Sequence, residues 1–537
     1  MGAVEEHAHE RRWWILAVLC FSLLVIVLDN SILNVAIPTI INDLHASNSQ
    51  LQWIVDSYTL VFAGLLLTAG ALGDRFGRRG ALQLGFVIFG VGSVLAALSS
   101  SAGQLIGTRA LMGVGGAFIM PATLSIITNI FPPQERGRAI GVWAGVAGLG
   151  GALGPLTGGF LVEHFYWGSV FLVNVPIVVI GLVAGFVLIP DSRDPSAPRL
   201  DPIGALLSIL GLTALLYAII EAPAEGWGEP VILSTLIGGV VLLVAFVLWE
   251  RHSDHPMLDV TFFSNPRFSA ASASITVVFF AMFGSIFLLT QYFQFVLGYS
   301  PLQTGIRMLP FAATMMVVAP TSARIVERIG TKITVTVGMS FVTLGLLSMA
   351  LLQVDSSYGQ VAWRLVLVAA GMGLTMAPAT DSVMGSLPLG KAGVGSAVND
   401  TTRQVGGALG VAIIGSVLAS TYGDQVREFL TGVGAPTAAV EAATSSLGGA
   451  NGVAAQAPAA QGAELMRVAN QAFVDAMHWG VLVAAAVTAT GALAALAFLP
   501  ARARATNLAA QSGEFLTEHA ADRDVAEIRR ELGTDAS

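Results

Sequence analysis

Fourteen long apolar segments decide what this chain can fold into. Each is long enough to cross the roughly 30 Å hydrocarbon core of a bilayer as a helix that rises about 1.5 Å per residue. Lipid offers no partner for backbone hydrogen-bonding groups, which a helix satisfies internally. The sequence therefore predicts an all-α polytopic membrane protein with 14 transmembrane helices, at residues 13–37, 51–71, 80–99, 103–129, 138–162, 167–189, 201–221, 231–249, 268–296, 302–323, 333–352, 360–386, 394–420 and 474–499.

Composition points to the same class of protein. Of the 537 residues, 54% are hydrophobic and 11% are charged, whereas soluble domains carry about 25% charged residues. The net charge is −8 and no basic patch is present, so nucleic acid is not an expected partner. The expected partners are the lipid bilayer, protons and small-molecule substrates, and we expect the chain to act as a monomer.

The distribution of Lys and Arg orients the helices in the membrane. Of the 26 basic residues, 20 fall on the side of the N-terminus. Cytoplasmic loops carry the excess of positive charge in membrane proteins. We therefore expect a multi-pass protein of the cytoplasmic membrane with both termini in the cytoplasm. The exceptions are Arg427 and Arg467 on the opposite side, and Arg109, Arg307, Arg364 and Arg403 inside spans.

An internal repeat divides the chain. The order acid–Arg–x–Gly occurs after the second span, at residues 74–77, and again after the tenth, at residues 327–330. Parallel repeats of this kind place substrate near the midplane, between the two halves. We expect an N-terminal six-helix bundle (1–189), a linker with two inserted helices (190–267), a C-terminal six-helix bundle (268–499) and a cytoplasmic tail (500–537). The segment 422–473 is expected to be a mobile outer loop with at most short helices.

Ionisable residues inside the spans are the first functional candidates. Burying one costs at least about 2.5–3.5 kcal/mol, so a residue of this kind is a candidate for a functional role. Asp29 lies roughly 24 Å from the cytoplasmic end of its span, and Asp56 and Arg109 are expected at a similar depth. Asp381 and Asp400 lie nearer the cytoplasm, where Asp381 is expected to pair with Arg403.

Two interpretations of these acids remain open. In the first, a carboxyl group gains and loses a proton as access alternates, because low dielectric favours the neutral form and a nearby Arg favours the charged form. In the second, the acid belongs to a static ion pair or faces water near a helix end. We expect Asp29 and Arg109 to couple proton movement, and Asp56, Asp381 and Asp400 to bind substrate.

The loop after the second span is expected to act as a conformational latch. Its acid can dock at the N-terminus of another helix or against a facing Arg, and its basic residues can clamp the cytoplasmic mouth. Such contacts would hold one conformation closed until a charge change releases them. The expected latch residues are Gly70, Asp74, Arg75, Gly77, Arg78 and Arg79.

The fifth span carries small residues on one narrow face. The positions that follow one another at intervals of three or four along the helix are Gly141, Gly145, Gly148, Ala152, Pro155 and Gly159. Small residues on one stripe allow a neighbouring backbone to approach closely. A proline at position 155 loosens the helical hydrogen bonding, so we expect a bend at Gly154 and Pro155 and a moving contact along this face.

These segments resemble the fourteen-span drug:proton antiporter family of the major facilitator superfamily, over residues 13–499. Residues 28–38 resemble the first-span motif of that family, residues 70–82 its signature loop, and Arg109 with Gly113 and Gly115 its fourth-span motif. Residues 167–176 resemble the next family segment, although Gly168 and Ser169 depart from it. The motif associated with exporters is matched at Gly150, Gly154, Pro155, Gly158 and Gly159.

The resemblance implies a major-facilitator-like fold and a proton-coupled multidrug efflux antiporter. It implies no cofactor beyond the proton gradient and no enzymatic activity. Asp56 within residues 53–58 is similar to an arrangement in exporters of cationic dyes and quaternary ammonium compounds. Two alternatives remain, namely an exporter or symporter of a specific metabolite or nutrient, and a non-transporting structural or lipid-handling membrane protein.

Two other motifs are rejected. Residues 385–392 nearly match a phosphate-binding loop, but they lack its final Ser or Thr and join two membrane spans, so ATP is not an expected partner. His252, Asp254 and His255 are polar loop residues and not an expected metal site.

Overall fold

The computed structural model describes residues 11–44, 46, 48–194 and 200–501. Within these ranges the chain forms 14 helices that are long and apolar enough to cross a membrane, and no strand. The predicted all-α class with its fourteen spans is confirmed. All but the first two residues of the expected tail lie outside the described ranges.

The N-terminal bundle has its own hydrophobic core, which continues slightly into the second half of the chain. Its sixth span is a short helical turn followed directly by a longer helix. The elements are α2 (Arg12–Leu44), α3 (Asn48–Phe76), α4 (Arg78–Ala97), α5 (Ala102–Ile130), α6 (Pro133–His164), α7 (Ser169–Leu172) and α8 (Asn174–Leu188).

The C-terminal bundle surrounds a second and larger hydrophobic core. Its first helix ends in a π-helical turn, Tyr292–Val296. The elements are α11 (Pro266–Gln291), α12 (Pro301–Ile329), α13 (Thr331–Met349), α14 (Tyr358–Met384), α15 (Ala392–Gly432) and α18 (Ala459–Phe498), with α16 (Thr437–Ser445) and α17 (Leu447–Gln456) between the last two.

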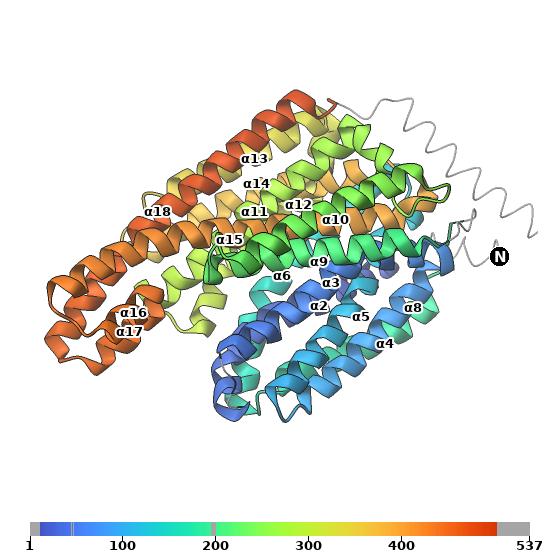
Figure 1. Ribbon diagram of the computed structural model, residues 1–537. Helices are drawn as coiled ribbons and strands as arrows, with labels where there is room; N and C mark the ends of the chain where they lie inside the picture. The colour runs from blue at the N-terminus through green and yellow to red at the C-terminus, as the bar shows by residue number, and fades with distance from the viewer. Residues whose placement is uncertain (1–10, 45, 47, 195–199, 502–537) are drawn as a thin grey trace, which may run out of the picture.

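The two inserted helices, α9 (Pro202–Glu225) and α10 (Pro230–His252), lie against the seam between the bundles. Helix α9 packs on α3 of the N-terminal bundle and on α15 of the C-terminal bundle, while α10 packs mainly on α9. Figure 1 shows this green pair between the blue helices and the yellow-to-red helices. Helix α9 therefore contacts both bundles.

Local sequence explains where many of these helices begin. Proline occupies the first turn of α6, α9, α10, α11 and α12, where its missing N–H costs nothing. Side chains cap several of the same helices: Asp201 accepts from Gly204 N, and Ser300 forms a capping box with Gln303.

The repeated acid–Arg–x–Gly motif ends a helix in both halves. Gly77 separates α3 from α4 with φ 117°, and Gly330 separates α12 from α13 with φ 84°. Residues with a side chain rarely adopt these positive φ values. The repeat therefore preserves the sharp turn as well as the charge.

The outer segment 422–473 is not the loop that we expected. Helix α15 continues through it to Gly432, α18 begins already at Ala459, and α16 and α17 fill the space between. The Tyr422 hydroxyl donates to Ala443 O at 3.0 Å and thereby ties α15 to α16. Alanine, abundant here, has the highest helix propensity. Figure 1 shows this helical extension projecting beyond the N-terminal bundle.

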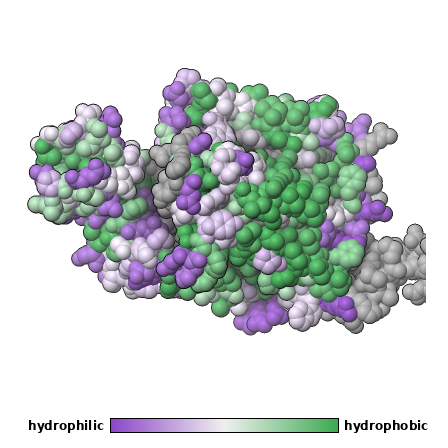
Figure 2. All heavy atoms as spheres, turned by 90° about the horizontal axis from the view of Figure 1, so that it is seen from below, coloured by the Kyte–Doolittle hydropathy of each residue, from purple (hydrophilic) through white to green (hydrophobic). Residues whose placement is uncertain are grey.

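The surface bears the pattern of a membrane protein. Figure 2 shows a broad hydrophobic band across one face, bordered by hydrophilic residues at its ends. Exposed apolar side chains on α10, such as Val241 and Val244, would face water if the chain were soluble. A lipid environment removes that cost.

The small-residue stripe of α6 packs against α12 and so joins the two bundles. A Cβ atom added to Gly141 would lie 2.5 Å from Ala319 O and 2.7 Å from Pro320 Cα. At Gly145 and Gly148 the nearest atoms belong to Met316 and Met315. The predicted stripe is thus a close contact between helices of opposite bundles.

Gly141→Ala is expected to lower the melting temperature of the purified protein in detergent. The added methyl group collides with α12 backbone, and overpacking of this kind costs about 1–3 kcal/mol. The matched control is Gly151→Ala on the same helix, where an added Cβ meets nothing within 4 Å. Helix propensity favours alanine by about 0.8–1.0 kcal/mol, so the control should be neutral or slightly stabilising. Equal shifts in both variants would contradict the close packing.

A second set of glycines on α6 faces α2. Ser31 Oγ donates to Gly150 O at 3.2 Å. A Cβ at Gly154 would collide with the Ser31 side chain, so these two helices meet without room for a larger residue. Gly158 is buried in the same helix, which continues through Pro155. The bend that we expect at Gly154 and Pro155 stays a prediction.

Candidate transport site and candidate latch

Asp29 of α2 and Arg109 of α5 form an ion pair inside the N-terminal bundle. Arg109 Nη1 lies 2.5 Å from Asp29 Oδ2. Asp29 is 0% exposed and Arg109 is 1% exposed. The structure thus brings together the two residues that depth alone placed at one level.

Further contacts hold this pair in a fixed geometry. Asn174 of α8 donates to Asp29 Oδ1 at 2.8 Å, so both carboxylate oxygens accept a hydrogen bond. Arg109 Nε donates to Ile54 O of α3 at 3.2 Å. The guanidinium carbon lies 4.4 Å from the centre of the Tyr58 ring, a favourable cation–π contact. Four spans therefore converge on this ion pair.

Asn174 is a site residue that the sequence did not single out. Its only signal is its position in residues 167–176, which resemble a family segment of unassigned role. Asn174 Nδ2 also lies 3.4 Å from Ser93 Oγ of α4. The amide thereby links Asp29 to a fifth span.

Asp56 takes no part in this cluster, although it lies on α3 close in sequence to Tyr58. The charged side chain that interacts electrostatically with Asp56 is Glu221 of the inserted helix α9. Gln52, one turn before Asp56, donates to Glu221 Oε2 at 2.6 Å. The outer acids thus occupy two separate environments, one inside the bundle and one against α9.

The predicted pairing of Asp381 with Arg403 is wrong. Asp381 lies near the C-terminal end of α14, where Arg136 Nε of α6 donates to its Oδ1 at 2.8 Å. Arg267 of α11 also contributes positive charge near this carboxylate. The pair Arg136–Asp381 therefore connects α6 of one bundle with α14 of the other.

Arg403 instead stays on its own helix beside Asp400. Its Nη1 lies 3.6 Å from Asp400 Oδ1, and both residues are buried. The guanidinium carbon also lies 4.7 Å from the centre of the Trp143 ring, which belongs to α6. This second buried pair therefore touches the opposite bundle through an aromatic contact.

Asp74, one of the expected latch residues, lies near the end of α3. Its carboxylate accepts from Gly393 N at 2.8 Å and from Val394 N at 3.0 Å, the first residues of α15. A carboxylate at a helix N-terminus satisfies free N–H groups and faces the positive end of the helix dipole. Arg78, 1% exposed, lies on the other side of Asp74, with Nε to Oδ1 at 2.9 Å.

Arg78 extends the latch to the C-terminal bundle. Its Nη2 donates to Leu389 O at 2.8 Å and to Gly390 O at 3.0 Å. These carbonyl groups belong to the segment rejected above as a phosphate-binding loop. Gly70 permits the crossing, since an added Cβ would lie 2.6 Å from Gly393 O. The two bundles are therefore held together at the end of the molecule where α3 ends and α15 begins.

The linker to the inserted helices takes part in the same contacts. Arg78 N donates to Ser192 O at 2.9 Å, and Asp194 N donates to Asp74 O at 2.6 Å. Lys391 Nζ lies 3.7 Å from Asp194 Oδ2. The other two basic residues of the expected latch make local contacts. Arg79 Nη1 donates to Ile189 O at 3.3 Å, and the guanidinium carbon of Arg75 lies 5.3 Å from the centre of the Phe76 ring.

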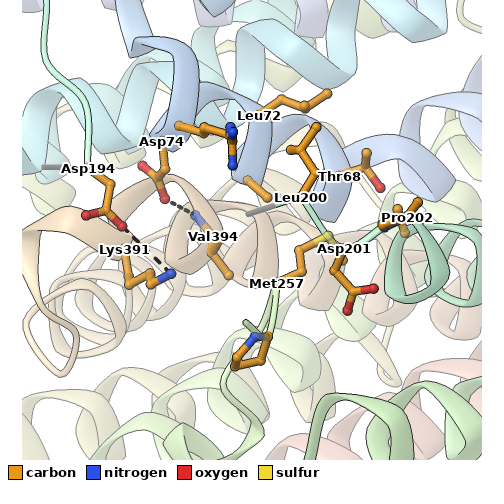
Figure 3. A pocket seen from close by; sticks show the side chains of 14 residues that line it. Thr68, Leu72, Asp74, Asp194, Leu200, Asp201, Pro202, Met257, Lys391 and Val394 are labelled. Atoms are coloured by element: carbon orange, nitrogen blue, oxygen red, sulfur yellow. Dashed lines mark hydrogen bonds and ion pairs between the residues drawn. The ribbon is translucent and has the colours of Figure 1, made fainter. Parts of the chain in front are cut away.

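A small cavity of about 150 Å³ lies beside the latch. Figure 3 shows Asp74 and Val394 joined on one side of it, and Asp194 and Lys391 next to them. The rest of the lining combines apolar side chains, among them Leu200 and Met257, with the polar or charged Thr68, Arg75 and Asp201. The cavity marks the meeting point of α3, α15 and the inserted-helix linkers.

Comparison with known proteins gives a family for this arrangement. Residues 19–411 match the family model described as Major Facilitator Superfamily. The multidrug efflux pump LfrA of Mycolicibacterium smegmatis is 36% identical over 490 residues, which cover 91% of this chain and 96% of the relative. The methyl viologen resistance protein SmvA of Salmonella typhimurium is 34% identical over 467 residues, covering 86% and 93%.

A solved structure shares the fold. A bacterial homologue of the human lysosomal transporter Spinster, in an inward-facing and unoccupied conformation, has a TM-score of 0.57. The match covers 92% of this chain and 99% of that one at 19% identity. At this identity the likeness concerns the fold alone.

Proposed function

Because the chain belongs to the Major Facilitator Superfamily and is a multi-pass membrane transporter and not an enzyme, we propose that it exports amphipathic, often cationic compounds across the cytoplasmic membrane in exchange for protons. The names of the relatives, a multidrug efflux pump and a methyl viologen resistance protein, support the substrate class. The charge asymmetry of the sequence supports cytoplasmic termini. The proposal needs no cofactor, no ATP and only one copy of the chain.

The observation that carries proton coupling is the buried Asp29–Arg109 pair. Arginine only donates hydrogen bonds and keeps its proton, so Asp29 is the member of the pair that can take one up. Protonation would remove the charge attraction and leave Arg109 to rely on Ile54 O and the Tyr58 ring. The five spans that meet here would then be free to change their packing.

The latch supplies the second half of the cycle. Contacts of Asp74 with α15 and of Arg136 with Asp381 close the cytoplasmic side. In this conformation a proton reaches Asp29 from outside and substrate leaves. Rearrangement around protonated Asp29 then separates the latch, the proton passes to the cytoplasm and a new substrate enters. Asp400 and Asp56 remain our candidates for cation recognition, whereas we assign Asp381 to closure.

The energy available fits this role. One charge that moves through 100 mV releases about 2.3 kcal/mol. That free energy supports a roughly fifty-fold gradient of a neutral solute for each proton. A monocation exchanged for one proton moves no net charge, so its export draws on the pH difference alone, about 1.4 kcal/mol for each tenfold difference in proton concentration.

Everted membrane vesicles test the proposal. An imposed gradient, acidic inside, is expected to drive ethidium accumulation in vesicles that contain the protein, and a protonophore should release the dye. Vesicles from cells without the protein are the control. Absence of accumulation, with the protein present and the gradient intact, would contradict drug export and favour a specific metabolite or nutrient as the substrate.

A further inference from the structure

The outer end of the seam between α3 and α9 contains two acids without a basic partner. Asp56 is 7% exposed, and its Oδ2 has no hydrogen-bond partner among the described residues. Glu221 is equally buried and accepts from Gln52. No ion pair found in the described part of the chain involves either acid. Asp29, in contrast, has Arg109 as its basic partner.

The two carboxylates repel one another, and burying their negative charges without a positively charged partner costs free energy. They lie close enough for the charge on Glu221 to act on Asp56. Acids within membrane spans are normally paired or line a functional path. A site with this charge requires either protons or a cation from outside the chain.

Aromatic side chains stand beside the acids. Trp53 of α3 stacks on Tyr217 of α9, with ring centres 6.1 Å apart and planes at 28°. Tyr217 is one turn from Glu221, and Trp53 is one turn from Asp56. Aromatic faces bind organic cations, and quaternary ammonium groups are recognised in this way. Carboxylates next to aromatic rings favour an organic cation over a bare proton.

The placement makes the site dependent on the inserted helix. Below the acids, Leu60 and Ala63 of α3 pack on Leu216 of α9 and on Val405 and Ala408 of α15. At the outer end of α9, Trp227 Nε1 donates to Ser416 Oγ of α15 at 3.0 Å. Helix α9 thus carries Glu221 while it contacts both bundles, so relative movement of the bundles changes the distance between Glu221 and Asp56.

We propose that Glu221 completes an organic-cation subsite with Asp56, Trp53 and Tyr217, and that this subsite selects compounds with two positive charges. One carboxylate comes from the N-terminal bundle and the other from the inserted helix, so a dication can engage both while a monocation needs one. The inference rests on the proposed function and names a substrate class for it. It gives the inserted helices a direct part in recognition.

Glu221→Gln tests the subsite through direct binding. Radiolabelled methyl viologen (a dication) and tetraphenylphosphonium (a monocation) would be bound to the purified full-length protein in detergent without added lipid. We expect the dication dissociation constant to rise at least about tenfold and the monocation constant to rise at most about threefold. The matched control is Glu225→Gln, an exposed acid on the same helix, which should bind both probes like the parent.

Each other outcome overturns the subsite. Equal weakening of both probes would show a general effect of Glu221, and unchanged dication binding would show that it lies outside any cation site. If the parent protein shows no measurable dication binding, the two acids bind only protons. Binding is measured separately from transport. If the parent protein accumulates ethidium but gives one of these binding results, the proposed function stands and the subsite is refuted.

Discussion

Asp29→Asn is expected to abolish proton-driven ethidium accumulation in everted vesicles. Asparagine keeps the size of the side chain and can still meet Arg109 and Asn174, but it cannot take up and release a proton. Exchange of labelled ethidium for unlabelled ethidium, which needs no net proton movement, should continue. The measurement therefore compares gradient-driven uptake with exchange in the same vesicles.

Two further variants serve as controls for this result. Asp29→Glu keeps a titratable group and should retain part of the coupled uptake. Asp43→Asn alters an exposed acid near the outer end of the same helix and should behave as the parent. Fluorescence-detected size exclusion checks that each variant is folded and inserted. Full coupled uptake by Asp29→Asn would remove the central residue of the proposal.

The spans could be predicted because hydropathy is a local property. All predicted segments correspond to helices of the structure, and most ends differ by only a few residues. The largest errors occur where a helix continues beyond the bilayer, as α15 does to Gly432 and α18 does from Ala459. Hydropathy marks where lipid ends and carries no information on where a helix ends.

The partners of the buried charges were less predictable. Counting residues along a span gives depth, so Asp29 and Arg109 could be placed at one level. Depth does not give the direction in which a side chain points, and that direction depends on the rotation and tilt of each helix. Asp381 and Arg403 therefore looked like partners, while the structure pairs Asp381 with Arg136 from the other bundle.

The residues that sequence reasoning missed share a physical reason. Glu221 ends the predicted span 201–221 and so resembled a boundary residue, yet α9 continues to Glu225. Asn174 is uncharged, so the cost of burying charge in lipid gave no signal for it. Both acquire their importance from contacts with helices distant in sequence, Gln52 for one and Asp29 for the other.

Asp74→Ala is expected to open the cytoplasmic side of the transporter. The substitution removes both carboxylate oxygens that accept hydrogen bonds from the N-terminus of α15. It also leaves the buried Arg78 without its negatively charged partner. Breaking one member of a buried pair costs about 3–5 kcal/mol, and this cost falls on the closed conformation alone. The population should therefore shift toward a state in which the start of α15 is exposed to the cytoplasm.

Cysteine labelling measures this shift. Ser396 near the start of α15 is 0% exposed, so Ser396→Cys in a Cys20→Ala background gives a single reporter. A membrane-impermeant maleimide added to everted vesicles should label it at least about tenfold faster when Asp74 is replaced by Ala, because a shift of about 1.4 kcal/mol already changes a population tenfold.

The repeat provides the matched control for the latch. Glu327 occupies in the second half the position that Asp74 occupies in the first, but its side chain is exposed. Glu327→Ala should leave the labelling rate unchanged, because closure on that side depends on Arg136 and Asp381. Equal acceleration by both substitutions would mean that loop charge in general, and not the docking of Asp74 on α15, holds the cytoplasmic side closed.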